Sequence, residues 1–402
     1  MQRFTKSFTQ QEGLSDESIA RAVAVMQTGR LHRYNTEANE ISETSLLEKE
    51  FAEYLGVDYS LACASCGYAM TVALRAFGLK NNEPVLTNAL TLSPVPGSIY
   101  AAGGRPILVE STDALVLDLD DLEQKLKATS ARVLLISHMR GHVIDMEALL
   151  ALLHQYEAVL IEDCAHTMGA QWNGKKSGTF GIAACFSTQS YKHINSGEGG
   201  LLVTNNSELM ARAVILSGSY MFYDHHIAGP SEEAYENIKL KTPNCSGRMD
   251  NLRAAVLRPQ LAELETRVKK WLVLYQALES KLQNLDNLTL ITRSPKEYFV
   301  GSSFQFLIPK ISATQAESFL KKCEEYGVFI KWFGAKEPHG YTSQYSNWHY
   351  LENQSLPHTD QLLNSLFDIR LPLTFNVNDC HQIGEIIRFS FLKTLAKRKE
   401  ND

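Results

Sequence analysis

The stretch STQSYKHINSGEGG, residues 187–200, places Lys192 in a polar segment between two apolar runs. The flanking runs, residues 182–186 and 200–203, are short and apolar, as expected of buried strands. Upstream, residues 158–162 (AVLIE) form a further strand-like run that Asp163 closes. A lysine in a Ser/Gly-rich loop and a carboxylate at a strand end are therefore the features from which the fold and the site are interpreted.

The apolar runs around this stretch alternate with helical patterns. Strands are expected near residues 84–87, 105–110, 132–137 and 158–162, with a helix over residues 146–156. Near-continuous apolar strands separated by helices predict a parallel sheet covered on both faces, which is an α/β fold. In such sheets ligands bind outside the carboxyl ends of the strands, and Asp163 falls at such an end.

Lys192 and Asp163 together are what a protein needs to hold pyridoxal phosphate. The lysine forms a Schiff base with this cofactor, and a carboxylate keeps the pyridine nitrogen protonated so that the ring accepts electrons. Because apolar strands flank Lys192, we expect its amine at an inner edge of the sheet, where desolvation lowers its pKa. Taken alone, Lys192 could be a solvated surface charge and Asp163 a turn residue or helix cap. Their occurrence as a pair favours the cofactor site.

Composition and charge limit the partners, the location and the metal sites that can be expected for this chain. The 402 residues carry a formal net charge of −6, which argues against nucleic acid or an anionic membrane surface as the main partner. The N-terminus has no apolar signal region and no run is long enough to cross a bilayer, so we expect a cytoplasmic protein. Seven scattered cysteines indicate reduced thiols. A lone CxxC at residues 63–66 and the DHH of residues 224–226 do not predict a metal site.

Five segments occur in an order that is specific as a series. They are residues 64–70 (ASCGYAM), 162–166 (EDCAH), 185–187 (CFS), Lys192 with the following GEGG, and 247–250 (GRMD). The series resembles the DegT/DnrJ/EryC1/StrS aminotransferases, which are fold-type I pyridoxal phosphate enzymes. The resemblance runs from about residue 40 to residue 260 and continues more weakly to residues 371–373.

The resemblance implies a large domain with a mostly parallel seven-stranded sheet covered by helices, and a smaller C-terminal α+β domain. We place an N-terminal arm at residues 1–40, the cofactor-binding domain at 41–250, and a bridging helix with the small domain at 251–402. The bridging helix is expected over residues 251–285, where apolar residues recur at helical spacing.

One group of residues is predicted to hold the cofactor phosphate. Cys66, Gly67 and Tyr68 open a helical run, where free backbone N–H groups and the helix dipole suit an anion. In the family this turn binds the phosphate, with a threonine where this chain has Tyr68. Ser187 matches a phosphate-contacting serine. An ordinary helix start is the alternative for residues 65–68.

A second group is predicted around the cofactor ring. The resemblance implies that Asp163 faces the pyridine nitrogen, that His166 lies near the phenolic oxygen, and that Lys192 is the catalytic lysine. Leu92 stands where the family has a stacking aromatic residue, and Ser246 aligns with an asparagine supplied by the neighbouring subunit. A purely structural histidine is the alternative for His166.

The activity implied by the resemblance is transfer of an amino group from glutamate or glutamine to a keto sugar, nucleotide-linked sugar or related ketone. The expected partners are small-molecule donor and acceptor, and a second copy of the chain in a homodimer with shared active sites. Two alternatives stay open: a pyridoxal phosphate-dependent lyase, dehydratase or cyclising enzyme, and a non-catalytic cofactor-binding regulatory protein. Leu92, Tyr191 and Ser246 motivate the first, because they alter the walls of the site that steer which bond breaks.

Overall fold

A seven-stranded sheet forms the centre of the computed structural model, which describes residues 1–395. The strand order is β1-β9-β8-β5-β4-β2-β3. The strands are β1 (Tyr59–Cys63), β2 (Pro84–Asn88), β3 (Arg105–Val109), β4 (Val133–Ser137), β5 (Val159–Asp163), β8 (Ala183–Ser187) and β9 (Gly200–Thr204). Strands β2, β3, β4, β5 and β8 pair in parallel, whereas β9 pairs antiparallel with β8 and β1. The predicted mostly parallel sheet is confirmed.

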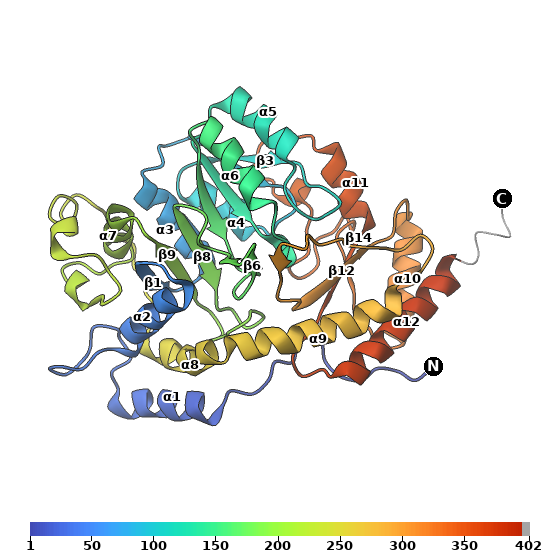
Figure 1. The fold of residues 1–402 in the computed structure, drawn as a ribbon, viewed down its shortest axis with the longest axis horizontal. Coiled ribbons are helices and arrows are strands. Elements are labelled where there is room, and N and C mark those ends of the chain that lie inside the picture. Colours follow the sequence, from blue (N-terminus) through green and yellow to red (C-terminus); the bar gives the residue numbers. More distant parts are fainter. Residues whose placement is uncertain (396–402) are drawn as a thin grey trace.

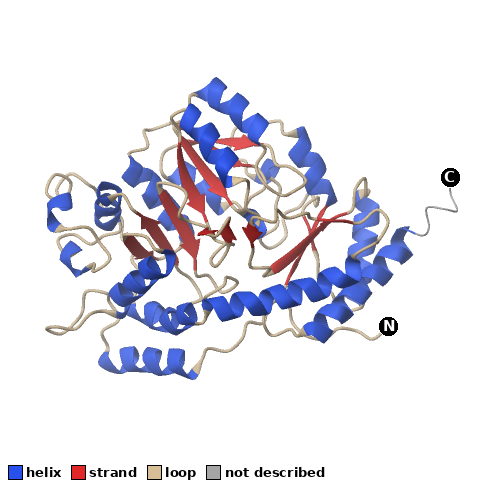
Figure 2. Cartoon of the chain, in the orientation of Figure 1, coloured by secondary structure: helices blue, strands red, loops and turns tan. Residues whose placement is uncertain are grey.

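Helices cover both faces of this sheet (Figures 1 and 2). On one face lie α3 (Cys66–Phe77), α4 (Pro94–Ala101) and α7 (Ser207–Leu216); on the other lie α2 (Glu43–Leu55), α5 (Leu119–Thr129), α6 (Met146–Gln155) and α8 (Asn251–Ala262). Successive residues of a strand enter opposite cores: Leu135 packs with α3 and α7, whereas Leu134 packs with α5 and α6. This two-residue alternation explains why both faces are apolar.

The segment predicted as one bridging helix is two helices. Helix α8 ends at Ala262, and α9 (Leu264–Leu282) follows after Glu263, whose backbone angles are φ −92° and ψ −2°. Pro259 lies in the last turns of α8, where it removes one backbone donor from the helix ladder. Helical spacing of apolar residues continues through such a break, so the periodicity alone did not reveal it.

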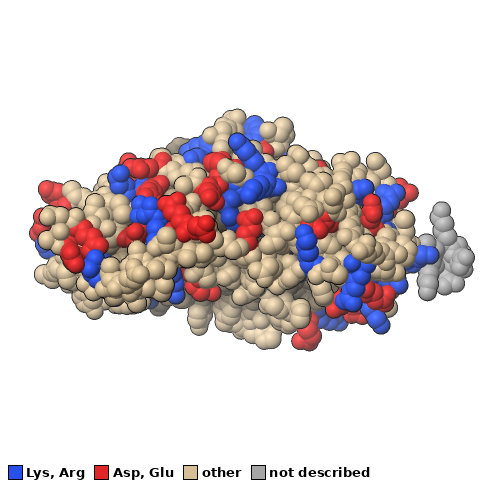
Figure 3. Space-filling model, turned by 90° about the horizontal axis from the view of Figure 1, so that it is seen from below, with Lys and Arg blue, Asp and Glu red and all other residues tan. Residues whose placement is uncertain are grey.

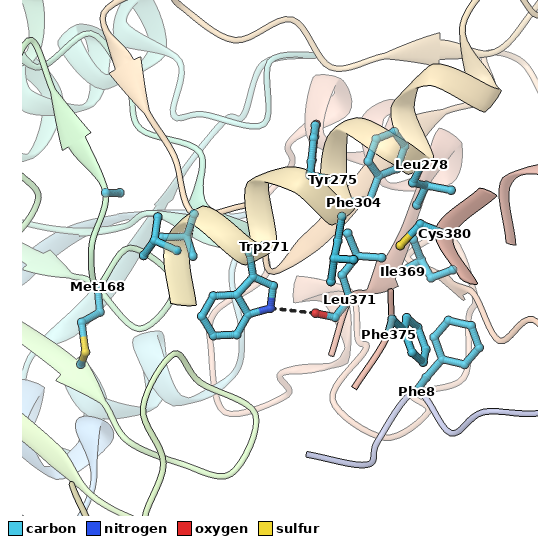
Figure 4. Packing of buried hydrophobic residues seen from close by; sticks show 14 of the residues in the cluster. Phe8, Met168, Trp271, Tyr275, Leu278, Phe304, Ile369, Leu371, Phe375 and Cys380 are labelled. Carbon is cyan, nitrogen blue, oxygen red and sulfur yellow. Dashed lines mark hydrogen bonds between the residues drawn. The ribbon is translucent and has the colours of Figure 1, made fainter. Parts of the chain in front are cut away.

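Helix α9 connects the central sheet to the C-terminal part and packs along α12 (Val377–Leu395) (Figure 1). Trp271 of α9 is buried and donates its indole N–H to the Leu371 carbonyl at 2.8 Å. Figure 4 shows this bond together with Phe304 and Ile369, two strand residues of the C-terminal part that belong to the same hydrophobic cluster as Trp271. The bridging role predicted for this region therefore belongs mainly to α9.

A second, four-stranded sheet lies in the C-terminal part, with the order β10-β12-β14-β13. Its strands are β10 (Thr289–Leu290), β12 (Ser303–Leu307), β13 (Lys331–Trp332) and β14 (Leu366–Arg370), and its helices are α10 (Ala313–Glu325), α11 (Pro357–Ser365) and α12. A strand is predicted at residues 328–330, whereas β13 begins at Lys331. A third sheet pairs β11 (Glu297–Tyr298) with β6 (Gln171–Trp172), which pairs with β7 (Lys175–Lys176). It ties the C-terminal part to the central sheet.

Among the described residues, the remaining elements are α1 and four short 3-10 turns. Helix α1 (Asp16–Thr28) lies against α8 (Figure 1). The turns are η1 (Met139–Gly141), η2 (Tyr223–His225), η3 (Glu232–Tyr235) and η4 (Tyr345–Asn347). Within residues 1–395, no helix is both long and apolar enough to cross a membrane. In Figure 3, acidic and basic side chains lie interspersed over the face seen from below, so this face offers nucleic acid no continuous cationic strip.

Candidate active site

A cavity of about 290 Å³ opens at the carboxyl ends of β4, β5 and β8 and at the start of α3. Of the nine residues predicted for the site, seven line this cavity: Cys66, Gly67, Leu92, Asp163, His166, Ser187 and Lys192. They come from segments far apart in the sequence. They meet because parallel strands end at one edge of the sheet and the chain continues from each strand into a loop or helix there.

Asp163 is held in a fixed orientation at the end of β5. Its side chain is buried, and its Oδ2 accepts a hydrogen bond from the Ser137 hydroxyl at 2.7 Å. Its Oδ1 accepts a hydrogen bond from the Ala165 backbone N–H at 3.1 Å and lies 3.8 Å from the Cys66 sulfur. Both oxygens are therefore oriented by neighbours, and the carboxyl group forms part of the cavity lining.

Lys192 lies on the loop between β8 and β9 and lines the same cavity as this carboxyl group. The loop is fixed by backbone hydrogen bonds from Lys192 to Gln189 (2.8 Å) and from Ser190 to Gly197 (3.0 Å). Burial, and next the positive charge of Arg140, lower the pKa of Lys192 to about 8. A lysine with this pKa has a substantial neutral, nucleophilic fraction near neutral pH.

His166 lies beside the lysine amine. The distance between His166 Nε2 and Lys192 Nζ is 3.1 Å. Burial, followed by the charge of Lys192, holds the pKa of His166 well below its usual value. The imidazole is therefore neutral at neutral pH, and it can exchange a hydrogen bond with the amine or with a polar atom of a bound molecule.

The start of α3 forms another part of the cavity lining, and free backbone N–H groups at a helix start can bind an anion. The Ser65 hydroxyl caps α3 by accepting a hydrogen bond from the Tyr68 N–H at 3.1 Å, so the N–H groups of Cys66 and Gly67 stay free of this cap. Gly200 packs directly on the backbone of residues 65 and 66, where an added Cβ would overlap it. The absence of a side chain at Gly200 lets β9 approach the start of α3.

Two predicted residues, Tyr68 and Ser246, are not part of the cavity lining. The Tyr68 hydroxyl donates to the carbonyls of Leu216 (3.1 Å) and Cys245, and the ring lies on Gly247. The Tyr68 side chain is therefore directed away from this cavity, and its backbone N–H is already bound to the Ser65 hydroxyl. Ser246 was predicted to act in the neighbouring subunit, so that role stays a prediction.

Comparisons with known proteins identify the family of this chain. The sequence pattern of the DegT/DnrJ/EryC1/StrS aminotransferase family matches residues 14–388. The chain belongs to this family. The match covers both the cavity edge of the central sheet and the C-terminal sheet, and it confirms the resemblance inferred from the ordered segments.

Individual relatives of this DegT/DnrJ/EryC1/StrS chain agree with that assignment. A pleiotropic regulatory protein from Geobacillus stearothermophilus is 30% identical over 288 residues, covering 69% of this chain and 71% of its own length. A GDP-perosamine synthase from Caulobacter vibrioides is 30% identical over 241 residues, covering 60% of this chain and 62% of its own length. The crystal structure of the aminotransferase TlmJ from Streptoalloteichus hindustanus superposes with a TM-score of 0.81 at 19% identity, over 96% of this chain and 98% of that one. The last comparison confirms the predicted fold.

The structure adds residues to the site that the sequence did not single out. Arg140, Lys331 and Arg370 line the same cavity as Lys192. Arg140 follows β4, so its position at the carboxyl edge of the sheet was a usable signal. Lys331 and Arg370 come from the C-terminal sheet, where the motif series of the family is weakest, and no sequence feature linked them to Lys192.

Proposed function

We propose that this protein is a pyridoxal phosphate-dependent aminotransferase that moves an amino group from glutamate or glutamine to a keto sugar, nucleotide-linked sugar or related ketone. The observation that carries the proposal is the joint presence of Lys192 and Asp163 in one cavity, with His166 at 3.1 Å from the lysine amine. Family membership supports the reaction class, and the GDP-perosamine synthase among the relatives supports a sugar as acceptor.

The donors in the cavity fit the chemical groups of pyridoxal phosphate. Asp163, oriented by Ser137, would pair with the pyridine nitrogen, and the N–H groups of Cys66 and Gly67 with Ser187 would hold the phosphate. When bound, the cofactor supplies an aromatic ring that accepts electrons from the substrate carbon. Leu92 supplies an apolar wall for a ring, although it offers no π-stacking.

Lys192 and His166 would carry the proton chemistry. A group whose pKa is about 8 can take up and return a proton near neutral pH with little free-energy penalty, so Lys192 suits a general acid and base at the substrate carbon. The neutral His166 keeps the amine in place through its ring nitrogen. The Asp163 carboxyl group is held in position by hydrogen bonds from the Ser137 hydroxyl and the Ala165 N–H, so it would meet the cofactor in a fixed orientation.

Further parts of the proposal concern assembly and location. We infer a homodimer in which Ser246 reaches the neighbouring subunit's cavity, because its side chain does not line its own. The segment between α7 and α8 contains Ser246 and also several exposed apolar residues, which supports an interface there. These residues are Tyr220, Met221, Phe222 and Leu240. A cytoplasmic location is part of the same proposal.

The test begins with cofactor binding. Protein purified with added pyridoxal phosphate should show the absorbance of a lysine-bound cofactor, and Lys192→Ala should lose it together with turnover. Lys269→Ala, an exposed lysine on α9, is the matched control and should change neither. A Lys192→Ala protein that retained both the absorbance and full turnover would overturn the assignment of the catalytic lysine.

A second measurement separates transamination from the alternatives. Incubation of the cofactor-loaded protein with L-glutamate should release one 2-oxoglutarate per site in the absence of any ketone. Release of ammonia with the substrate, or a cyclised product, would indicate a lyase or cyclising enzyme instead. Because one relative is named a regulatory protein, a cofactor-binding protein that reacts with no amine is the remaining outcome to test.

A further inference from the structure

The C-terminal sheet presents a polar face to the cavity. In β14, Phe367 and Ile369 belong to the hydrophobic core, so the alternation of side chains along a strand sends Asp368 and Arg370 to the opposite face. Lys331 of β13 is the cross-strand partner of Asp368, and directly opposed residues share a face. Lys331, Asp368 and Arg370 therefore form one polar surface, two cations of which line the cavity.

Arg140 meets this surface from the central sheet. Its side chain is only 8% exposed, and its Nη2 lies 3.0 Å from Asp368 Oδ2. Nevertheless, Nε and Nη2 of this guanidinium have no hydrogen-bond acceptor in suitable geometry. The residue also has a left-handed backbone conformation, with φ 54°. A buried guanidinium with free donors is costly unless a ligand supplies an acceptor.

The cationic side chains at this surface, Arg140, Lys331 and Arg370, outnumber the one carboxylate in contact with Arg140, which is Asp368. The Oδ1 of Asp368 already accepts a hydrogen bond from Gln305 Nε2 at 2.7 Å. Arg370 stacks on the Tyr191 ring at 3.8 Å from the guanidinium carbon to the ring centre, which orients it without neutralising it. Burial, then the charge of Arg140, lower the pKa of Lys331 to about 8, as expected for crowded cations.

We propose that Arg140, Lys331 and Arg370 form a carboxylate-binding subsite for a substrate that reacts at Lys192. Two planar guanidinium groups and an ammonium group match the acceptor geometry of a carboxylate. The same three residues and Lys192 line one cavity, so a single bound molecule can present its acid group to them and its reacting carbon to Lys192. The inference rests on the proposed function only in naming Lys192 as the reacting centre. The carboxylate comes either from the amino donor or from an acid group on the ketone.

Binding of glutarate, a dicarboxylate with no amine or ketone, tests the subsite without any reaction. Calorimetry with the cofactor-loaded protein should detect glutarate, and Lys331→Met and Arg370→Met should each weaken its affinity by about 10-fold to 100-fold, the range for a hydrogen bond to a charged group. Lys336→Met, an exposed lysine that follows β13, should leave the affinity unchanged. Equal affinity in all four proteins, or no binding up to roughly 10 mM, above usual KM values, would overturn the subsite.

The contribution of Arg140 needs a variant that still folds. A separate kinetic assay identifies the source of the carboxylate. Arg140→Met leaves Asp368 without its ion-pair partner, so the double variant Arg140→Met/Asp368→Asn, checked by its unchanged melting temperature, carries this part of the test. Single-turnover assays with L-glutamate then compare the subsite variants with the wild-type protein. A half-saturating L-glutamate concentration that is at least about 10-fold higher in the variants assigns the subsite to the donor. Unchanged glutamate kinetics with weakened glutarate binding assign it to the ketone. Failure of wild-type protein to release 2-oxoglutarate would instead reject the proposed function and leave the glutarate result to stand alone.

Discussion

The pKa of Lys192 predicts how fast the cofactor-free protein captures pyridoxal phosphate at different pH values. Burial and the charge of Arg140 lower this pKa from 10.5 to about 8. At pH 7 about a tenth of such an amine is neutral, compared with about 3 in 10,000 for a lysine of pKa 10.5. Since the neutral amine is the nucleophile, the protein should react about 300-fold faster than an ordinary lysine, apart from gains due to binding.

The assay compares the protein with Nα-acetyl-lysine amide under identical conditions. Dividing the two capture rates cancels the titration of the cofactor itself. The ratio should stay at its maximum below about pH 7 and decrease by roughly 30-fold between about pH 7 and 9.5. The decrease occurs because Lys192 becomes mostly neutral above about pH 8, whereas the free lysine continues to gain neutral amine up to about pH 10.5. The direction of this change does not depend on the absolute advantage gained from binding.

A ratio that stays constant from pH 7 to 9.5 would refute the reasoning, because it would mean that Lys192 titrates like a solvated lysine. Arg140→Met provides a second check, since it removes the largest charge effect that lowers the pKa and should move the decrease to higher pH. Lys269→Met removes an exposed charge on α9 and should leave the profile unchanged.

Three further predictions concern other parts of the chain. Asp163→Asn should retain the fold but lower turnover with glutamate by about 100-fold or more, measured as kcat, because an amide cannot hold the pyridine nitrogen protonated. Glu48→Gln should cost about 3–5 kcal/mol in urea unfolding, because it leaves the fully buried Arg33 without its partner at 2.6 Å. The pKa of Glu48 is lowered to about 2, so in wild type this contribution is complete above about pH 4.5 and is lost as the pH falls toward 2. Trp271→Phe should cost about 1–3 kcal/mol in the same assay, since the Leu371 carbonyl loses its 2.8 Å donor.

Each of these three has an outcome that contradicts it. Wild-type kcat in Asp163→Asn would remove the carboxylate from the mechanism. If Arg33→Met/Glu48→Leu is as unstable as Glu48→Gln, the unpaired charge is not the cause of the loss. A Trp271→Phe protein that unfolds at the wild-type urea concentration would show that the carbonyl finds another donor.

The central sheet and most of the cavity could be predicted because their signals are local. Continuous apolar runs identify strands buried on both faces. Because parallel strands have their carboxyl ends at one edge of the sheet, Asp163, Ser187 and Lys192 are expected at the same edge without any knowledge of side-chain packing. Tyr68 shows the limit of this reasoning. Its place at the start of α3 is a local property, but the direction of its ring depends on the loop carbonyl of Cys245, far away in the sequence.

The break between α8 and α9 shows a second limit. Apolar spacing reports which side of a helix is buried, and that side continues through Glu263. The position of the break depends on the lost donor of Pro259 and on how each helix packs, with α8 against α1 and α2 and α9 against α12. Only the proline was visible in the sequence, and a proline in a helix end does not by itself fix the bend.

The cationic surface that Arg140, Lys331 and Arg370 form could not be predicted from the sequence, for a different reason. Strand β13 has two residues, and its pairing of Lys331 with Asp368 joins segments that no local pattern connects. Once the core residues of β14 are known, however, the side chains that face the cavity are determined as well. Phe367 and Ile369 must face the core, and a shift of one residue in β14 would bury Asp368 and Arg370 there instead. In the observed register the buried Asp368 contacts Arg140 and Gln305, and the penalty for burying these charges without such partners favours this register. The same register directs Arg370 to the cavity that contains Lys192.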